Sequence, residues 1–128
     1  VELVYATQNK MSYAALKNAA GKFVLPTLES VTAAGASGMA RMPEDFRISI
    51  VNAEGEASYP ISGFTYLLVY KTQKDAAKGK VLVDFLKWGA HDGQKLTTEL
   101  TYAPLPEALV KKVDATIASI TGPGGAAL

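Results

Sequence analysis

Cysteine is absent from this chain of 128 residues, and histidine occurs only once, as His91. Without cysteine the chain can form neither a disulfide nor a thiolate metal site, and it offers no cysteine nucleophile. A single histidine also excludes a metal centre built from several imidazoles. Because these absences remove much of metal and nucleophilic chemistry, we predict no catalytic residue, no metal and no cofactor.

Charge of one sign and long apolar runs are equally scarce. Thirteen lysines and arginines against twelve aspartates and glutamates leave a formal net charge of +1. The chain therefore lacks the basic surplus that would indicate binding to nucleic acid or to an anionic membrane. The longest apolar stretch, Phe64 to Tyr70, is far shorter than the roughly 20 residues that span a bilayer. The composition is that of one globular domain with an ordinary core.

The N-terminal part predicts short strands around one helix. The apolar run Val1–Ala6 predicts a strand, and because it has no lead-in we expect the chain to be a piece of a longer protein. Tyr13–Leu25 predicts two short strands around a turn in which Gly21 supplies a positive φ. Thr27 is the expected N-cap of a helix that ends near residues 34–36, where glycines follow.

Two further stretches predict longer strands. Phe46–Val51 alternates apolar and polar residues, the pattern of a half-buried strand. Phe64–Tyr70 is apolar on both faces, which indicates a central strand covered by helices on each side. Its pairing should begin after Pro60, which cannot donate a ladder hydrogen bond.

Beyond Lys71 the apolar period changes from 2 to 3.6, which indicates helices. Asp92 is the expected cap of a short helix through Leu100, and Pro106 opens the last helix. Gly122–Gly125 stops that helix and should fray. The first of these helices ends at Gly89. Its predicted buried stripe is Ala77, Val81, Phe85 and Trp88, flanked by Leu82 and Leu86. The predicted buried stripe of the last is Leu109, Val113, Ile117 and Ile120.

Two short motifs could carry chemistry, but each has a plainer interpretation. His91–Gly93 contains a His-Asp doublet, yet no other histidine exists to complete a metal site, so a helix end and a cap are favoured. Ser62–Gly63 could be a nucleophile or an anion-binding turn. No general base lies near it in a recognisable motif, and entry into a strand is favoured.

The remaining candidates are weaker. Gly122–Gly125 follows a helix, whereas a phosphate-cradling loop must precede one, so we interpret it as a tail. Trp88 could stack on a ligand, but it shares an apolar stripe and is expected in the core. Arg41 and Arg47 could hold an anion, but no second cluster of donors lies beside them, and a solvated role is favoured.

Four blocks carry a resemblance to a known family over nearly the whole chain and in the same order. The chain resembles the C-terminal portion of the periplasmic phosphate-binding proteins that serve bacterial high-affinity phosphate ABC transporters. The blocks are Val1–Met11, Tyr59–Lys71, Phe85–Trp88 with Asp92–Lys95, and Tyr102–Pro106.

The resemblance implies an α/β fold, part of a two-lobed type II periplasmic-binding-protein fold with a mixed sheet covered by helices. In that family serine, threonine, aspartate and arginine side chains and helix N-terminal amides hold phosphate, including a Ser-Gly-Thr-type loop. None of these ligands maps onto this sequence, and Ser62–Gly63 matches a different block. We therefore expect no phosphate-binding residue here and place the ligands in an N-terminal portion.

The implied organisation is hinge-adjacent strands and a hairpin in residues 1–56, a central strand plus C-terminal helices in 57–121, and a tail in 122–128. The implied function is scaffold in a non-enzymatic periplasmic receptor that binds inorganic phosphate and delivers it to an ABC permease, although the chain shows no signal peptide. Expected partners are the complementary N-terminal half or a second copy, and no nucleic acid. The alternative is a small self-associating interaction domain without a small-molecule ligand.

Overall fold

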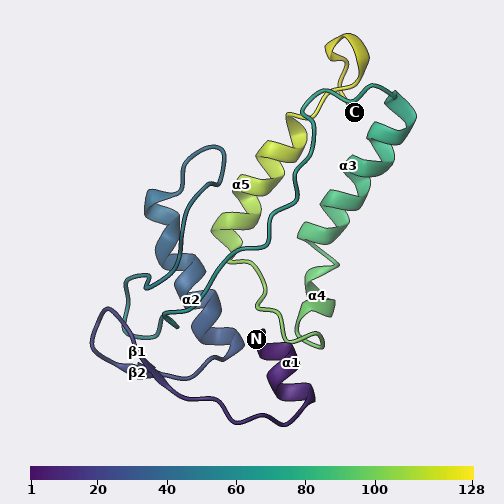
Figure 1. Cartoon of the computed structure of the whole chain (residues 1–128). Coiled ribbons are helices and arrows are strands. Elements are labelled where there is room, and N and C mark those ends of the chain that lie inside the picture. Colours follow the sequence, from purple (N-terminus) through teal and green to yellow (C-terminus); the bar gives the residue numbers. More distant parts are fainter.

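The computed structural model describes all 128 residues and combines helices, extended segments and one small sheet (Figure 1). This mixture confirms the α/β class expected from the sequence. None of the helices has the length and apolar character needed to cross a membrane. The helices are α1 (Leu3–Gln8), α2 (Leu28–Gly38), α3 (Ala76–Ala90), α4 (Gln94–Thr97) and α5 (Glu107–Ala118), with 3-10 turns η1 (Met39–Arg41) and η2 (Pro123–Gly125). The sheet is an antiparallel pair of β1 (Leu16–Lys17) and β2 (Phe23–Val24).

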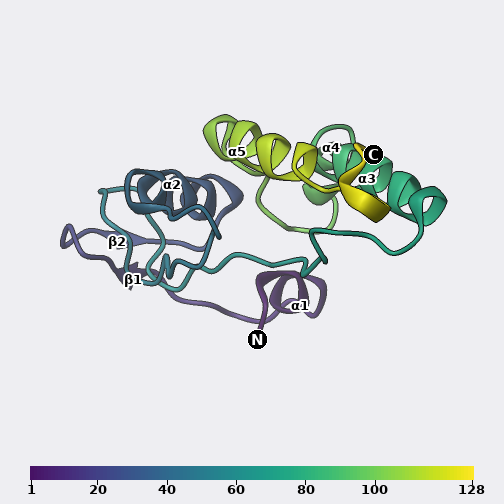
Figure 2. The ribbon, with the colours of Figure 1, turned by 90° about the horizontal axis from the view of Figure 1, so that it is seen from above.

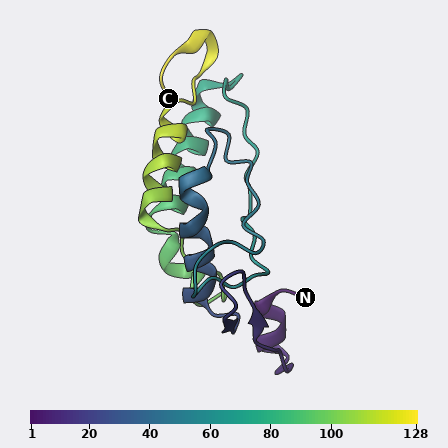
Figure 3. The same cartoon turned by 90° about the vertical axis from the view of Figure 1, so that its left-hand side faces the viewer.

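The elements form two layers. Seen from above, α2, α5 and α3 lie in one layer, with α1, the hairpin and a long extended segment below them (Figure 2). Seen from the side, α2, α3 and α5 lie on one side and the extended segments, with α1 at their end, on the other (Figure 3). The helices therefore cover the extended segments on one face only.

The predicted hairpin is confirmed, and Asn18 fastens it to a distant loop. The side chain is 5% exposed. Its Nδ2 donates to three backbone carbonyls in residues 55–58, at 2.8 to 3.1 Å. Its Oδ1 accepts the backbone N–H groups of Ala20 and Lys22 at 3.1 and 3.0 Å, which closes the turn at Gly21, where φ is +78°. One amide thus satisfies backbone groups in two segments nearly forty residues apart.

Helix α2 begins as the sequence predicts and ends later than predicted. The Thr27 hydroxyl accepts the Ser30 N–H at 3.2 Å, and the Ser30 hydroxyl accepts the Thr27 N–H at 2.9 Å, a capping box. The glycines do not stop the helix at residues 34–36. A Cβ on Gly38 would lie 2.8 Å from Ile50, and one on Gly35 would lie 3.4 Å from Phe64. These glycines instead let the helix lie close against the extended segments.

The prediction of a strand at Val1–Ala6 is wrong, because residues 3–8 form α1. A six-residue apolar run fits a strand or a helix equally well, and only a partner strand decides between them. No partner lies beside this run. The Thr7 hydroxyl instead bonds back to the carbonyls of Leu3 and Val4 within the helical turn.

The two longer strands were predicted with partners, and the structure gives them none. Residues 46–51 alternate as expected, with Phe46, Ile48 and Ile50 turned inward and the residues between them exposed. Yet no ladder pairs this segment with residues 64–70, and neither forms a strand; Phe46 has a positive φ of +61° and Val51 lies in a turn. The predicted central strand with helices on both faces is therefore wrong for this structure.

Helices α3 and α5 pack against each other around a core of Val83, Ala90, Ile117 and Ile120. The predicted stripe of α5 is confirmed, and α5 starts directly after Pro106. The predicted stripe of α3 is wrong. Val83 and Ala90 face the core, and Leu86 packs against it, whereas the predicted residues Val81, Phe85 and Trp88 are exposed.

The loop and tail beyond α3 also differ from prediction. Helix α3 continues through Gly89 to Ala90, and α4 covers only residues 94–97, with Gly93 rather than Asp92 at its N-cap. The tail after α5 does not fray. The Gly122 N–H donates to the Ala126 carbonyl at 2.7 Å, and a Cβ on Gly79 would lie 2.7 Å from Leu128. The chain end thus folds back onto α3.

We expect Asn18→Asp to lower the free energy of unfolding by about 1–3 kcal/mol, because the new carboxylate faces carbonyl oxygens that lose their donor. Urea denaturation followed by far-ultraviolet circular dichroism measures the change. Asn52→Asp is the matched control, because Asn52 is exposed. Equal denaturation midpoints for the two variants would contradict the role given to Asn18.

Candidate functional site

Residues 62–70 form an extended segment whose backbone pairs with no other backbone in the chain; only the Tyr70 carbonyl is bonded, by the side chain of Gln73. None of their N–H or C=O groups takes part in a backbone–backbone hydrogen bond. Pairing begins only at Lys71, whose carbonyl accepts the Thr121 N–H at 2.9 Å. Unpaired backbone in an extended segment is a template on which another strand can pair. We call residues 62–70 the open strand.

The open strand is apolar as well as unpaired. Leu67 is 71% exposed, Leu68 is 98% exposed and Tyr70 is 85% exposed. Only Phe64 is half-buried, where it packs against the core of Ala34, Ile50 and Ala53. Tyr66 donates its hydroxyl hydrogen bond to the carbonyls of residues 46 and 48, at 3.1 and 3.0 Å. The outer part of the segment therefore presents apolar side chains to solvent.

A groove of about 540 Å³ lies between the open strand and the helices. Residues of α3 and α5, of the open strand and of the loop at 42–46 line it. Most of the lining is apolar, and its aromatic members are Phe46, Phe64, Tyr66 and Phe85.

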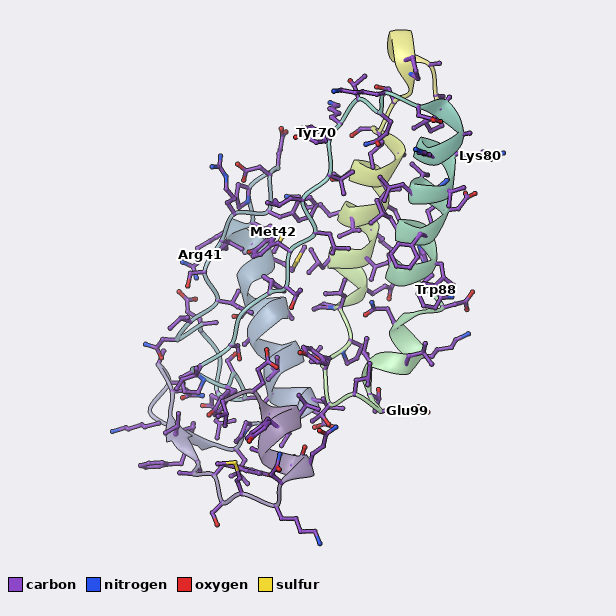
Figure 4. All side chains as sticks on the ribbon, turned by 45° about the vertical axis from the view of Figure 1, so that its right-hand side comes forward. Arg41, Met42, Tyr70, Lys80, Trp88 and Glu99 are labelled. Atoms are coloured by element: carbon purple, nitrogen blue, oxygen red, sulfur yellow. The ribbon has the colours of Figure 1, made fainter.

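Helix α3 adds a second apolar surface, formed by Val81, Phe85 and Trp88, which we call the α3 stripe. All three side chains are exposed, Trp88 by 47%. The rings of Phe85 and Trp88 stack with centroids 5.7 Å apart. Trp88 lies near the C-terminal end of α3, and Tyr70 at the end of the open strand (Figure 4). The chain covers this stripe only in part: Phe85 borders the groove, and a Cβ on Gly93 would lie 3.3 Å from the Trp88 ring.

The solvent-accessible surface of the chain is larger than its mass predicts. A compact protein of 13.5 kDa exposes about 6,500 Å² by the usual scaling with mass. This chain exposes 8578 Å². The excess of about 2,000 Å² is as large as the surface that a stable protein–protein interface buries.

The neighbouring residues His91 and Asp92 each pair with a different partner. His91 Nε2 lies 2.9 Å from Oδ1 of Asp114 on α5, and both side chains are partly exposed. Asp92 pairs with Lys95 at 2.8 Å, which lowers the pKa of Asp92 and raises that of Lys95. No three histidine, aspartate or glutamate side chains gather in the structure. Asp114 gave no signal in the sequence, because 23 residues separate it from His91.

The other candidates are occupied by local contacts. Arg47 pairs with Asp45 at 2.7 Å, which holds the pKa of that carboxyl below its usual range. Arg41 lies exposed at the end of η1. Ser62 is buried and donates its hydroxyl hydrogen bond to the Tyr59 carbonyl at 2.9 Å, but the segment that follows it is not a paired strand. Nothing brings these groups together around one anion.

Lys112 is the polar contact that the sequence analysis missed. Its Nζ donates to the carbonyls of Met42 and Pro43 at 2.9 and 2.7 Å. It also lies 5.5 Å from the centroid of the Phe46 ring, within reach of a cation–π interaction. The contact ties α5 to the loop that borders the groove. Nothing in the sequence marks it, because it joins residues about seventy positions apart.

The comparisons with known proteins can be set against this geometry. No family model matches the chain. The phosphate-binding protein PstS of Xylella fastidiosa strain 9a5c is 50% identical over 119 residues, which cover 93% of this chain and 33% of the relative. PstS of Pasteurella multocida is 36% identical over 115 residues, and PstS of Methanocaldococcus jannaschii 38% over 122 residues; these cover 90% and 86% of this chain and 33% and 31% of the relatives.

The resemblance noted in the sequence is thereby confirmed: the chain is homologous to phosphate-binding proteins. Each of these relatives carries the name PstS. The chain spans about one third of the length of the curated relatives it matches. In each of these relatives the matched stretch is part of a longer chain.

We expect Trp88→Ala to change the free energy of unfolding of this chain by much less than the roughly 3–5 kcal/mol that truncating a core aromatic costs. The reason is that 47% of the Trp88 surface is exposed to solvent. Ile117→Ala is the contrasting variant, because Ile117 is buried in the α3–α5 core, and we expect it to cost about 2–5 kcal/mol. Urea denaturation of both variants measures the difference. A larger loss for Trp88 than for Ile117 would show that α3 packs through the other face.

Proposed function

We propose that this chain is a scaffold segment of a periplasmic receptor that binds inorganic phosphate and passes it to an ABC permease. The similarity to proteins named PstS supports the ligand class. The observation that carries the proposal is the open strand next to the apolar groove. A segment of this kind needs strands at its edges and a covering layer, and the other two thirds of a PstS-sized protein would supply both.

The phosphate ligands, on this proposal, come from outside the chain. A tightly held phosphate needs several donors converging in a site shielded from water. Here the groove is lined mainly by hydrocarbon, Arg47 is engaged by Asp45, and Arg41 stands alone in solvent. The chain would therefore shape and support the cleft while other residues contact the anion.

We also propose that the chain divides near residue 57 into a hinge-adjacent part in residues 1–56 and a part that carries the C-terminal helices in 57–121. Two separate small cores support it. One, of Ala34, Ile50 and Ala53, lies under α2, and the other lies between α3 and α5. The open strand runs from the first toward the second, as a connection between lobes would. The tail at 122–128 folds onto the second core.

The second candidate function is a self-associating interaction domain without a small-molecule ligand. The same open strand favours it, because an unpaired apolar segment pairs as readily with a copy of itself. A non-enzymatic role is common to both candidates. Adding the other two thirds of a PstS-sized protein to this chain separates the two candidates. A receptor segment should then bind phosphate, whereas a self-associating domain should not.

Isothermal titration calorimetry with inorganic phosphate tests the proposal. We expect no saturable heat for the 128-residue chain, because its groove lacks anion donors. The full-length Xylella fastidiosa PstS, half-identical over the shared region, is the positive control and should bind. A dissociation constant in the micromolar range or tighter for the chain by itself would overturn the placement of the ligands elsewhere.

A further inference from the structure

We infer that residues 121–128, which we call the clasp, open and close over the start of α3 as a unit of their own while the rest of the chain stays folded. The sequence predicts only a fraying tail at this place. The inference goes beyond the proposed function, because it concerns how the two helices are fastened to the segment before them and does not depend on phosphate.

Thr121 joins the clasp to the segment that leads into α3. Its N–H donates to the Lys71 carbonyl at 2.9 Å, and its carbonyl accepts the Gln73 N–H at 2.7 Å. The hydroxyl oxygens of Thr72 and Thr121 lie 3.4 Å apart. These contacts form one isolated parallel bridge and no ladder. The two backbone bonds can therefore break without disrupting a sheet.

The glycine-rich stretch gives the clasp its turn. Gly124 and Gly125 have φ values of +69° and +83°, which glycine adopts without strain. The Gly122 N–H donates to the Ala126 carbonyl at 2.7 Å and closes the turn. The turn reverses the chain beyond α5 (Figure 1) and carries Leu128 back toward α3.

Leu128 closes the clasp by packing against the core between α3 and α5. Its seat exists because two residues there have no side chain. A Cβ on Gly79 would lie 2.7 Å from Leu128, and one on Gly122 would lie 3.1 Å from it. Leu128 stays partly exposed, and the clasp adds no other hydrophobic side chain to this core. Segments with so few buried apolar contacts open at a lower free energy than the core that they cover.

Exchange of backbone amide hydrogens in low concentrations of urea, followed by nuclear magnetic resonance, tests for this opening. The amides of Gln73, Thr121 and Gly122 should exchange through one shared opening. Its free energy should fall only slightly with urea, because the opening exposes little surface, whereas amides in the middle of α5 should show a much steeper dependence. Three amides that differ from one another, that follow the urea dependence of α5, or that exchange without protection would overturn the inference.

Removing the side chain that closes the clasp tests its cause. We expect Leu128→Ala to speed the exchange of the three amides at least tenfold, because the seat beside Gly79 is then empty. Leu68→Ala removes the same atoms from a side chain that is 98% exposed, and it should leave these exchange rates unchanged. Equal rates in the two variants would show that Leu128 does not hold the clasp.

Two glycine variants of α3 give an independent test. Alanine is favoured over glycine in a helix, and a Cβ on Gly89 would meet nothing within 4 Å. We therefore expect Gly89→Ala to raise the urea midpoint of unfolding and to leave exchange of the three amides unchanged. Gly79→Ala should raise the midpoint less and speed that exchange, because its methyl group would occupy the seat of Leu128. Equal midpoint gains with unchanged exchange in both variants would overturn the inference.

Discussion

The need of an extended backbone for hydrogen-bonding partners governs this structure. Helices satisfy their own N–H and C=O groups, so α2, α3 and α5 form wherever the pattern allows. A strand cannot do so, and the chain offers only one short hairpin and a few isolated bridges. Residues 47–50 and 62–70 consequently run as irregular chain without a sheet. Everything unusual about the molecule, including its open groove and its large surface, follows from these two segments.

A few polar anchors hold the extended segments in place where a sheet would otherwise do so. Asn18 binds the loop at residues 55–58, Tyr66 reaches the carbonyls of residues 46 and 48, and Lys112 holds those of residues 42 and 43. Each anchor is a side chain serving backbone groups, because no neighbouring strand is there to serve them. Close contacts at Gly35 and Gly38 then let α2 cover one side.

Sequence reasoning succeeded where the signal is local. The Thr27 cap, the turn at Gly21, the start of the last helix after Pro106 and the buried stripe of α5 all depend on residues within a few positions of one another. The family resemblance also survived comparison with known proteins.

It failed where the outcome depends on distant partners. Val1–Ala6 became a helix because no strand lies beside it. On α3 both the stripe of Val83 with Ala90 and the stripe of Phe85 with Trp88 are apolar, and only the position of α5 decides which is buried. Asp114 and Lys112 meet residues far away in the chain, and no spacing in the sequence could have revealed them.

The exposed tryptophan has a practical consequence. Trp88 is the single indole of the chain and is half exposed on the surface of α3. Its emission therefore reports on one place only, and a partner that settles over α3 should shift that emission to shorter wavelength and shield it from soluble quenchers. Binding of a partner over α3 can therefore be followed by the fluorescence of Trp88 without an added label.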